Sequence, residues 1–271
     1  MIVQSAPPGE AHFVINMEQH TELSGKLARA FGNDQFEALD PLDEMLYVID
    51  HHDQGWADLD AAPGRDAETG LPWNLVKTPF EKIIKTSSLS PDFNEKHHPY
   101  CGLISSMHSW GLYNGRYGLS DRVLLDMLVD DNRAVAAAML DGEIERQGRL
   151  KARLADSADT AAWIEDDHLL QNYKQLQLFD TLALYLNQAP EGDRGEATFE
   201  HVPLNATDDV NVALQPKGGG TYALAPFPFA KDGTEISFRG RYLKPQDEGA
   251  DLGAALRAIS EDVQTIRLVA G

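Results

Sequence analysis

The sequence predicts a mainly α-helical protein with a small antiparallel β subdomain, formed by C-terminal strands and an N-terminal hairpin. Residues from Met17 to about Gln188 carry apolar side chains at the three- and four-residue spacing of helical faces. Residues 1–16 alternate as two short β segments around the turn-forming "APPGE". Beyond residue 195, short alternating segments are separated by glycine-containing turns, as in a β meander.

The elements follow one another in a simple order along the 271 residues. After the hairpin, the apolar spacing predicts helices near residues 17–31, 40–54, 80–86, 98–109, 120–154 and 160–188. The interval 55–79 is rich in Gly, Pro and Asp and is expected to be a surface loop. The segments "VNVALQP", "TYALAPFPF" and "TEISFRGRYL" are predicted strands, followed by a short helix and a last strand.

We therefore expect three parts in the chain: a hairpin over 1–16, a helical domain over 17–190 and a β-rich subdomain over 195–271. The hairpin should join the C-terminal strands, because two isolated strands are marginally stable in water.

The charge of the chain disfavours several classes of partner. Lys and Arg total 23 against 43 Asp and Glu, a formal net charge of -20, which repels nucleic acids and anionic membranes. The only cysteine, Cys101, suits a reducing compartment, and no stretch resembles a signal peptide or a membrane span of about 18 apolar residues. These features predict a soluble cytoplasmic protein that acts on a small molecule.

The segment "YVIDHHDQGWADLD", residues 47–60, holds the first candidate site. His52 and Asp53 continue the apolar face of the predicted helix, whereas His51 lies about 100° further round it and should point away. A carboxylate within an apolar face costs several kcal/mol unless it is protonated, paired or bound to a metal. A metal ion accounts for both His52 and Asp53.

Three further helices carry an ionisable side chain on an apolar face. His20 lies on that of 17–31 and His108 on that of 98–109, while Asp180 lies one turn from both Leu176 and Leu184. Imidazole and carboxylate donors suit Mn, Fe, Zn or Mg, and the lack of a thiolate cluster argues against a closed structural zinc site. We expect one or two divalent metal ions, with ligands His20, His52, Asp53, His108 and Asp180.

The order His, His-Asp, Asp resembles the HD-domain superfamily of metal-dependent phosphohydrolases, whose ligands are matched here by His20, His52, Asp53 and Asp180. More closely, the chain resembles an uncharacterised bacterial family of HD-like proteins through "EQHTELSGKLARAFGN", "HHDQGW", "SSMHSWGLYNGRYG" and "NYKQLQLFDTLALYL". The resemblance implies an HD-domain-like helical bundle and a metal site, but no substrate. Dinuclear members usually have two more histidines before the last Asp, whereas here only His108 is well placed.

The first functional hypothesis is a metal-dependent hydrolase that acts on a small phosphorylated molecule through metal-activated water. Asp53 and His108 would act at the metal, and Lys174 and Arg116 would supply the positive charge that a phosphate needs in so acidic a protein. Three neighbours could contribute an aromatic wall or a hydrogen bond to a ligand: Trp56, Tyr113 and Asp60.

Two alternatives remain open. Some HD-type folds hold two irons and use dioxygen, so a di-iron oxygenase is one of them. The other is a non-catalytic, metal-stabilised binding or sensor module, whose β strands bind a partner or form a homo-oligomer.

Overall fold

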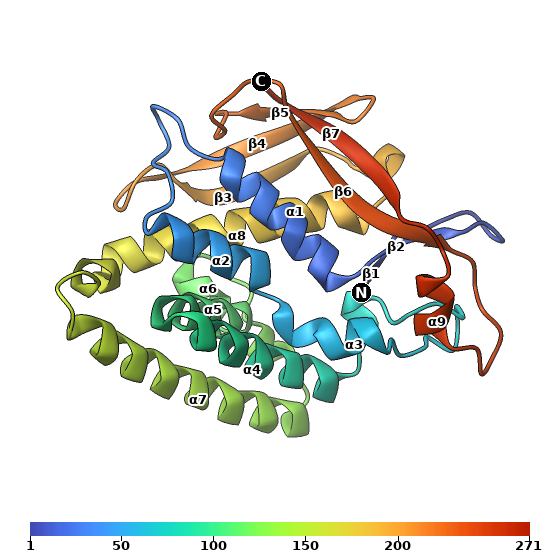
Figure 1. The fold of residues 1–271 in the computed structure, drawn as a ribbon, viewed down its shortest axis with the longest axis horizontal. Helices are drawn as coiled ribbons and strands as arrows, with labels where there is room; N and C mark the ends of the chain where they lie inside the picture. Colours follow the sequence, from blue (N-terminus) through green and yellow to red (C-terminus); the bar gives the residue numbers. More distant parts are fainter.

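A computed structural model describes residues 1–271 and shows a curled seven-stranded sheet packed on a stack of helices (Figure 1). About 51% of the chain is helical and 19% lies in strands. The prediction of a mainly α fold, an HD-domain-like helical bundle with a small antiparallel β subdomain, is therefore wrong.

The sheet has the strand order β1-β2-β6-β7-β5-β4-β3. As expected, the N-terminal hairpin joins the C-terminal strands, because β2 pairs antiparallel with β6, with Phe13 opposite Tyr242. All other neighbours are antiparallel except β5 and β7, which run parallel. The strands are β1 (Ile2–Val3), β2 (His12–Ile15), β3 (Ala197–Pro203), β4 (Asp209–Gly218), β5 (Thr221–Ala225), β6 (Thr234–Leu243) and β7 (Asp262–Ala270).

Two features of the sheet explain the error in fold class. Strand β3 is not among the strands predicted from the sequence. In the structure this strand contributes the buried side chains of Phe199 and Val202. The parallel pairing inserts β7 between β5 and β6, which a meander of consecutive hairpins does not allow. Helices α1 and α8 pack on this sheet, so that Leu27 and Phe179 belong to the same core of 40 buried residues as Phe238.

Nine segments are assigned as α-helix, and the expected helices are present with shifted ends. The predicted helix 40–54 ends at His51, that at 80–86 continues to His97, and that at 120–154 begins at Asp130. The helices are α1 (Met17–Ala30), α2 (Leu42–His51), α3 (Ala57–Ala61), α4 (Phe80–His97), α5 (Pro99–Tyr113), α6 (Gly115–Gly118), α7 (Asp130–Ala155), α8 (Asp166–Gln188) and α9 (Leu252–Arg257). None of them is long and apolar enough to cross a membrane.

The short α6 is a left-handed turn rather than a right-handed helix. Arg116 and Tyr117 have φ angles of 52° and 59°, in the region that side chains other than Gly rarely adopt. Flanking Gly115 and Gly118 also have positive φ, so all four residues of the turn are left-handed.

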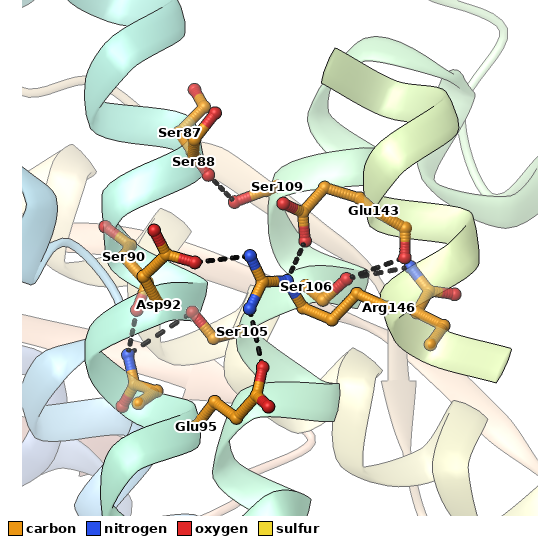
Figure 2. Close-up of polar contacts among 12 residues, drawn as sticks. Ser87, Ser88, Ser90, Asp92, Glu95, Ser105, Ser106, Ser109, Glu143 and Arg146 are labelled. Carbon is orange, nitrogen blue, oxygen red and sulfur yellow. Dashed lines mark hydrogen bonds and ion pairs between the residues drawn. The ribbon is translucent and has the colours of Figure 1, made fainter. Parts of the chain in front are cut away.

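Helix α7 is the outermost helix in Figure 1 and is fixed to α4 and α5 by a polar network. Figure 2 shows Arg146 of α7 donating to three carboxylates, those of Asp92 at 2.5 Å, Glu95 at 2.6 Å and Glu143 at 3.0 Å. Between α4 and α5, the Ser109 hydroxyl donates to the carbonyl of Ser87 at 2.8 Å. These contacts hold α5, and with it His108, in a fixed position against α4.

Candidate metal centre

The structure brings together all five candidate ligands. The donor atoms form two groups, and within each group all donor atoms lie within 4.8 Å of one another. One group contains His20, His52 and Asp53, and the other contains His52, His108 and Asp180. These side chains come from α1, the end of α2, α5 and α8, and His20 and Asp180 are 160 positions apart in the sequence.

His52 is held with one ring nitrogen facing the centre. It lies just after the last residue of α2, and its Nδ1 donates to the carbonyl of Ile49 at 2.8 Å. Its Nε2 is buried without a hydrogen-bond partner, 3.7 Å from Oδ1 of Asp180 and 3.8 Å from Oδ2 of Asp53. Burial lowers the pKa of His52, but the charges of Asp53 and Asp180 outweigh this and raise the pKa to about 9.

His20 and Asp180 form the second contact of the centre. Nδ1 of His20 lies 3.1 Å from Oδ1 of Asn187, and its Nε2 lies 3.1 Å from Oδ1 of Asp180. Burial opposes ionisation of Asp180, but the hydrogen bond from His20 and the charge of His52, 3.7 Å away, hold the pKa of Asp180 well below the ordinary value. Asp180 is thus a buried anion facing two imidazole nitrogens, and a shared cation would stabilise all three groups.

His108 completes the centre from α5. Burial lowers the pKa of His108 to about 4, so the ring is neutral, the form that binds a metal. Its Nδ1 lies 2.6 Å from Nε2 of Gln177, while the buried Oε1 of Gln177 has no partner. A half-turn of this amide would let Oε1 accept a hydrogen bond from the Nδ1–H of His108, leaving the Nε2 lone pair of His108 free for an ion.

Gln177 was missed in the sequence, although a signal was present. It precedes Asp180 by three residues and therefore lies on the same face of α8.

The spacing of the donor atoms suits one ion. Nitrogen and oxygen donors bound at 2.0–2.2 Å to a common ion lie roughly 3–4 Å apart, and the separations of 3.1, 3.7 and 3.8 Å fall in that range. His52 belongs to both groups of donors but has only one free ring nitrogen, so both groups describe a single centre.

Lys174 and Arg116 lie apart from this centre. Both line a cavity of about 230 Å³ between α8 and β3, which none of the five candidate ligands lines. Lys174 is paired with Asp209 of β4 at 2.6 Å. Gln177 also lines this cavity, and its side-chain amide contacts the ring of His108.

His51 points away from the centre, as its place on the helix predicts. Its Nδ1 contacts the carbonyl of Tyr47 at 2.8 Å, and its ring stacks on Tyr47. His97 stacks on Tyr47 as well, and His98 accepts a hydrogen bond from the backbone of Tyr100 at the start of α5. Neither His97 nor His98 therefore serves as an additional ligand.

One detail of the predicted surroundings differs. Asp60 accepts from the backbone of Met17 at 2.7 Å and contacts no imidazole. The two predicted aromatic residues, Trp56 and Tyr113, do line a cavity that reaches Asp53, His108 and Asp180.

Comparison with known proteins identifies the family of the chain but no function for it. No curated protein and no solved structure matches the chain. Nothing in these comparisons points to the HD-domain superfamily, so the resemblance in ligand order stays a prediction. A family model described as "Protein of unknown function (DUF3891)" matches residues 1–245, which is most of the sequence. The chain therefore belongs to the DUF3891 family.

Proposed function

We propose that the protein is a metal-dependent hydrolase that acts on a small phosphorylated molecule. A single divalent ion, Mn, Fe, Zn or Mg, would be held by His20, His52, Asp53, His108 and Asp180. The observation that carries this proposal is the buried Nε2 of His52, which has no hydrogen-bond partner and faces the carboxylates of Asp53 and Asp180. A histidine nitrogen left without a hydrogen-bond partner at that depth is unfavourable, and a bound cation in place of its proton would remove the cost.

The residues around the centre are suited to different tasks. The carbonyl of Ile49 and the amide oxygen of Asn187 orient His52 and His20 through their Nδ1 atoms. A bound ion would lower the pKa of water from 15.7 towards about 7 and so supply hydroxide at neutral pH. Asp53 is the one partly exposed carboxylate of the set, so it can accept the proton of the attacking water and pass it to solvent.

The positive charge for the phosphoryl group would come from the ion itself. Lys174 and Arg116 line the separate cavity between α8 and β3, so the chemical step would depend on the ion and Asp53.

Metal content and turnover test this proposal together. Protein purified without chelators should contain about one ion per chain. His52→Ala and Asp180→Ala should lose it, while His51→Ala, one position away, should keep it. The metal-loaded protein should hydrolyse phosphate esters in a panel that includes 4-nitrophenyl phosphate, and Asp53→Ala should not.

Three results would contradict the proposal. Wild-type protein that binds none of the four metals has no such centre. A protein that binds metal but releases no phosphate from any ester would be a binding module. Dioxygen consumption by the iron-loaded protein would identify an oxygenase instead.

A further inference from the structure

The candidate metal centre forms one wall of a largely apolar cavity. The cavity has a volume of about 350 Å³, and 12 of its 18 lining residues are hydrophobic. Asp53, His108 and Asp180 line it, but no Lys or Arg does. Ligand sites of this size are typically apolar with a few polar groups that fix orientation, and here those groups are the candidate metal ligands.

The other polar residues of the cavity are already occupied. The hydroxyl of Ser109 donates to the carbonyl of Ser87, and that of Ser87 donates to the carbonyl of Ile83 at 3.0 Å. The hydroxyl oxygen of Ser90 accepts from the backbone of Gly55 at 2.9 Å. A sugar or nucleotide would therefore find few free partners for its own polar groups along these walls.

Apolar side chains also surround the entrance. Val76 is 82% exposed and Met127 is 65% exposed, and both line the cavity from two short helical turns, Leu75–Lys77 and Leu124–Met127. Exposed apolar side chains beside a cavity are typical of a binding site. The net charge of -20 repels anionic lipid surfaces, which favours a single small molecule over a membrane as the occupant.

A second, polar cavity also reaches Asp53. It has a volume of about 350 Å³, and its lining residues include Asn16, Thr21, Gln54, Asp60 and Asp53. Asp53 thus lies between an apolar cavity and a polar one. Water can reach Asp53 through the polar cavity while an apolar group fills the other.

We propose that the apolar cavity binds the hydrocarbon part of the substrate, an ester of an apolar alcohol whose reacting group faces Asp53, His108 and Asp180. This inference rests on the proposed hydrolase function and names its substrate class. A cavity of 150 Å³ holds benzene, so 350 Å³ accommodates roughly two fused rings or an alkyl chain of about ten carbon atoms.

Binding of a neutral apolar probe tests the cavity without any turnover. We expect N-phenyl-1-naphthylamine to bind the metal-free and the metal-loaded protein with enhanced fluorescence. Met127→Glu should weaken this binding at least fivefold, because it places a charge at the entrance. Val263→Glu is the matched control, since Val263 is 58% exposed on β7, outside the cavity, and it should bind the probe like the wild type. Both residues are exposed, so neither variant should unfold the protein.

Turnover of matched substrates tests the class. Decyl phosphate and glucose 6-phosphate are both primary alkyl phosphates, and decyl phosphate should have a kcat/KM at least tenfold higher. Met127→Glu should reduce this preference, and Val263→Glu should not.

The two proposals fail in different ways. Equal turnover of both esters, with no probe binding that depends on Met127, would overturn the apolar substrate and leave the hydrolase intact. Probe binding that depends on Met127, with no ester hydrolysed, would overturn the hydrolase and leave an apolar ligand site.

Discussion

Metal binding should release a proton from His52. In the absence of an ion, burial lowers the pKa of this imidazole, but Asp53 and Asp180 outweigh burial and raise the pKa to about 9. At pH 7, well below that value, most of His52 carries a proton on Nε2. The same nitrogen is the donor for the ion, so binding must displace about one proton per chain.

The size of the effect follows from the pKa. Between pH 6 and pH 8 the apparent dissociation constant for the ion should fall about tenfold per pH unit, and the fall should level off near pH 9. His108, with a pKa lowered to about 4, is already neutral over this range and adds nothing to the slope.

Isothermal titration calorimetry in buffers of different ionisation enthalpy measures the number of protons released at pH 7. His51→Ala should release the same number as the wild type, since His51 contacts Tyr47 outside the centre. Release of no proton at pH 7, or an affinity that does not change from pH 6 to pH 8, would refute the assignment of His52 Nε2 as a ligand.

The same shift has a consequence for the stability of the metal-free protein. The folded-state pKa of His52 lies above the unfolded value of 6.5, so its contribution to stability is complete below pH 6.5 and is lost as pH rises through about 9. A shift of this size corresponds to about 3 kcal/mol. The metal-free protein should therefore be less stable to urea at pH 9 than at pH 6.5, and the difference should vanish in His52→Ala.

Three further predictions concern other parts of the fold. Arg146→Ala leaves buried Glu143 without its partner and should reduce the free energy of unfolding by about 3–5 kcal/mol in urea titrations. Arg149→Ala, at a side chain that is 55% exposed, should cost less than about 1 kcal/mol, and equal losses would contradict the role of burial. Burial raises the pKa of the Cys101 thiol to about 12, so the native protein should react with a thiol reagent only after unfolding, and rapid native reaction would contradict this. Gln177→Leu should weaken metal binding about 10- to 100-fold, and unchanged affinity in a folded variant would exclude the proposed orientation of His108.

Helical spacing alone predicted which of two adjacent histidines faces the interior. His52 is buried and His51 stacks on Tyr47, because one residue turns the helix by about 100° and this rotation is a local property. The same rotation per residue explains why Lys174 points away from Asp180. Six residues from Asp180 corresponds to a rotation of about 120°, which turns Lys174 away from Asp180 and towards Asp209.

Local sequence patterns do not predict which distant segments of the chain pair with each other. The parallel contact of β5 with β7 depends on how the chain crosses the sheet, and a strand of given sequence can pair on either side. The burial of α1 and α8 against that sheet follows from the pairing, so the helical spacing alone predicts a helical bundle instead. The left-handed turn at Arg116 is likewise set by its surroundings, because neither Arg nor Tyr favours positive φ.

The mixed sheet nevertheless matters for the candidate centre. Helix α1, which carries His20, packs on β6, and α8, which carries Asp180, packs on β3. The 3.1 Å contact between His20 and Asp180 is therefore fixed by two helices that share one rigid support. Asp53 follows α2 in a short turn and is partly exposed. The centre thus combines a preorganised side, formed by His20 and Asp180, with a solvent-accessible carboxylate between the polar and apolar cavities. Such a division favours proton exchange at Asp53, which supports the proposed role of Asp53 in the chemical step and of the other four residues as ligands of the proposed ion.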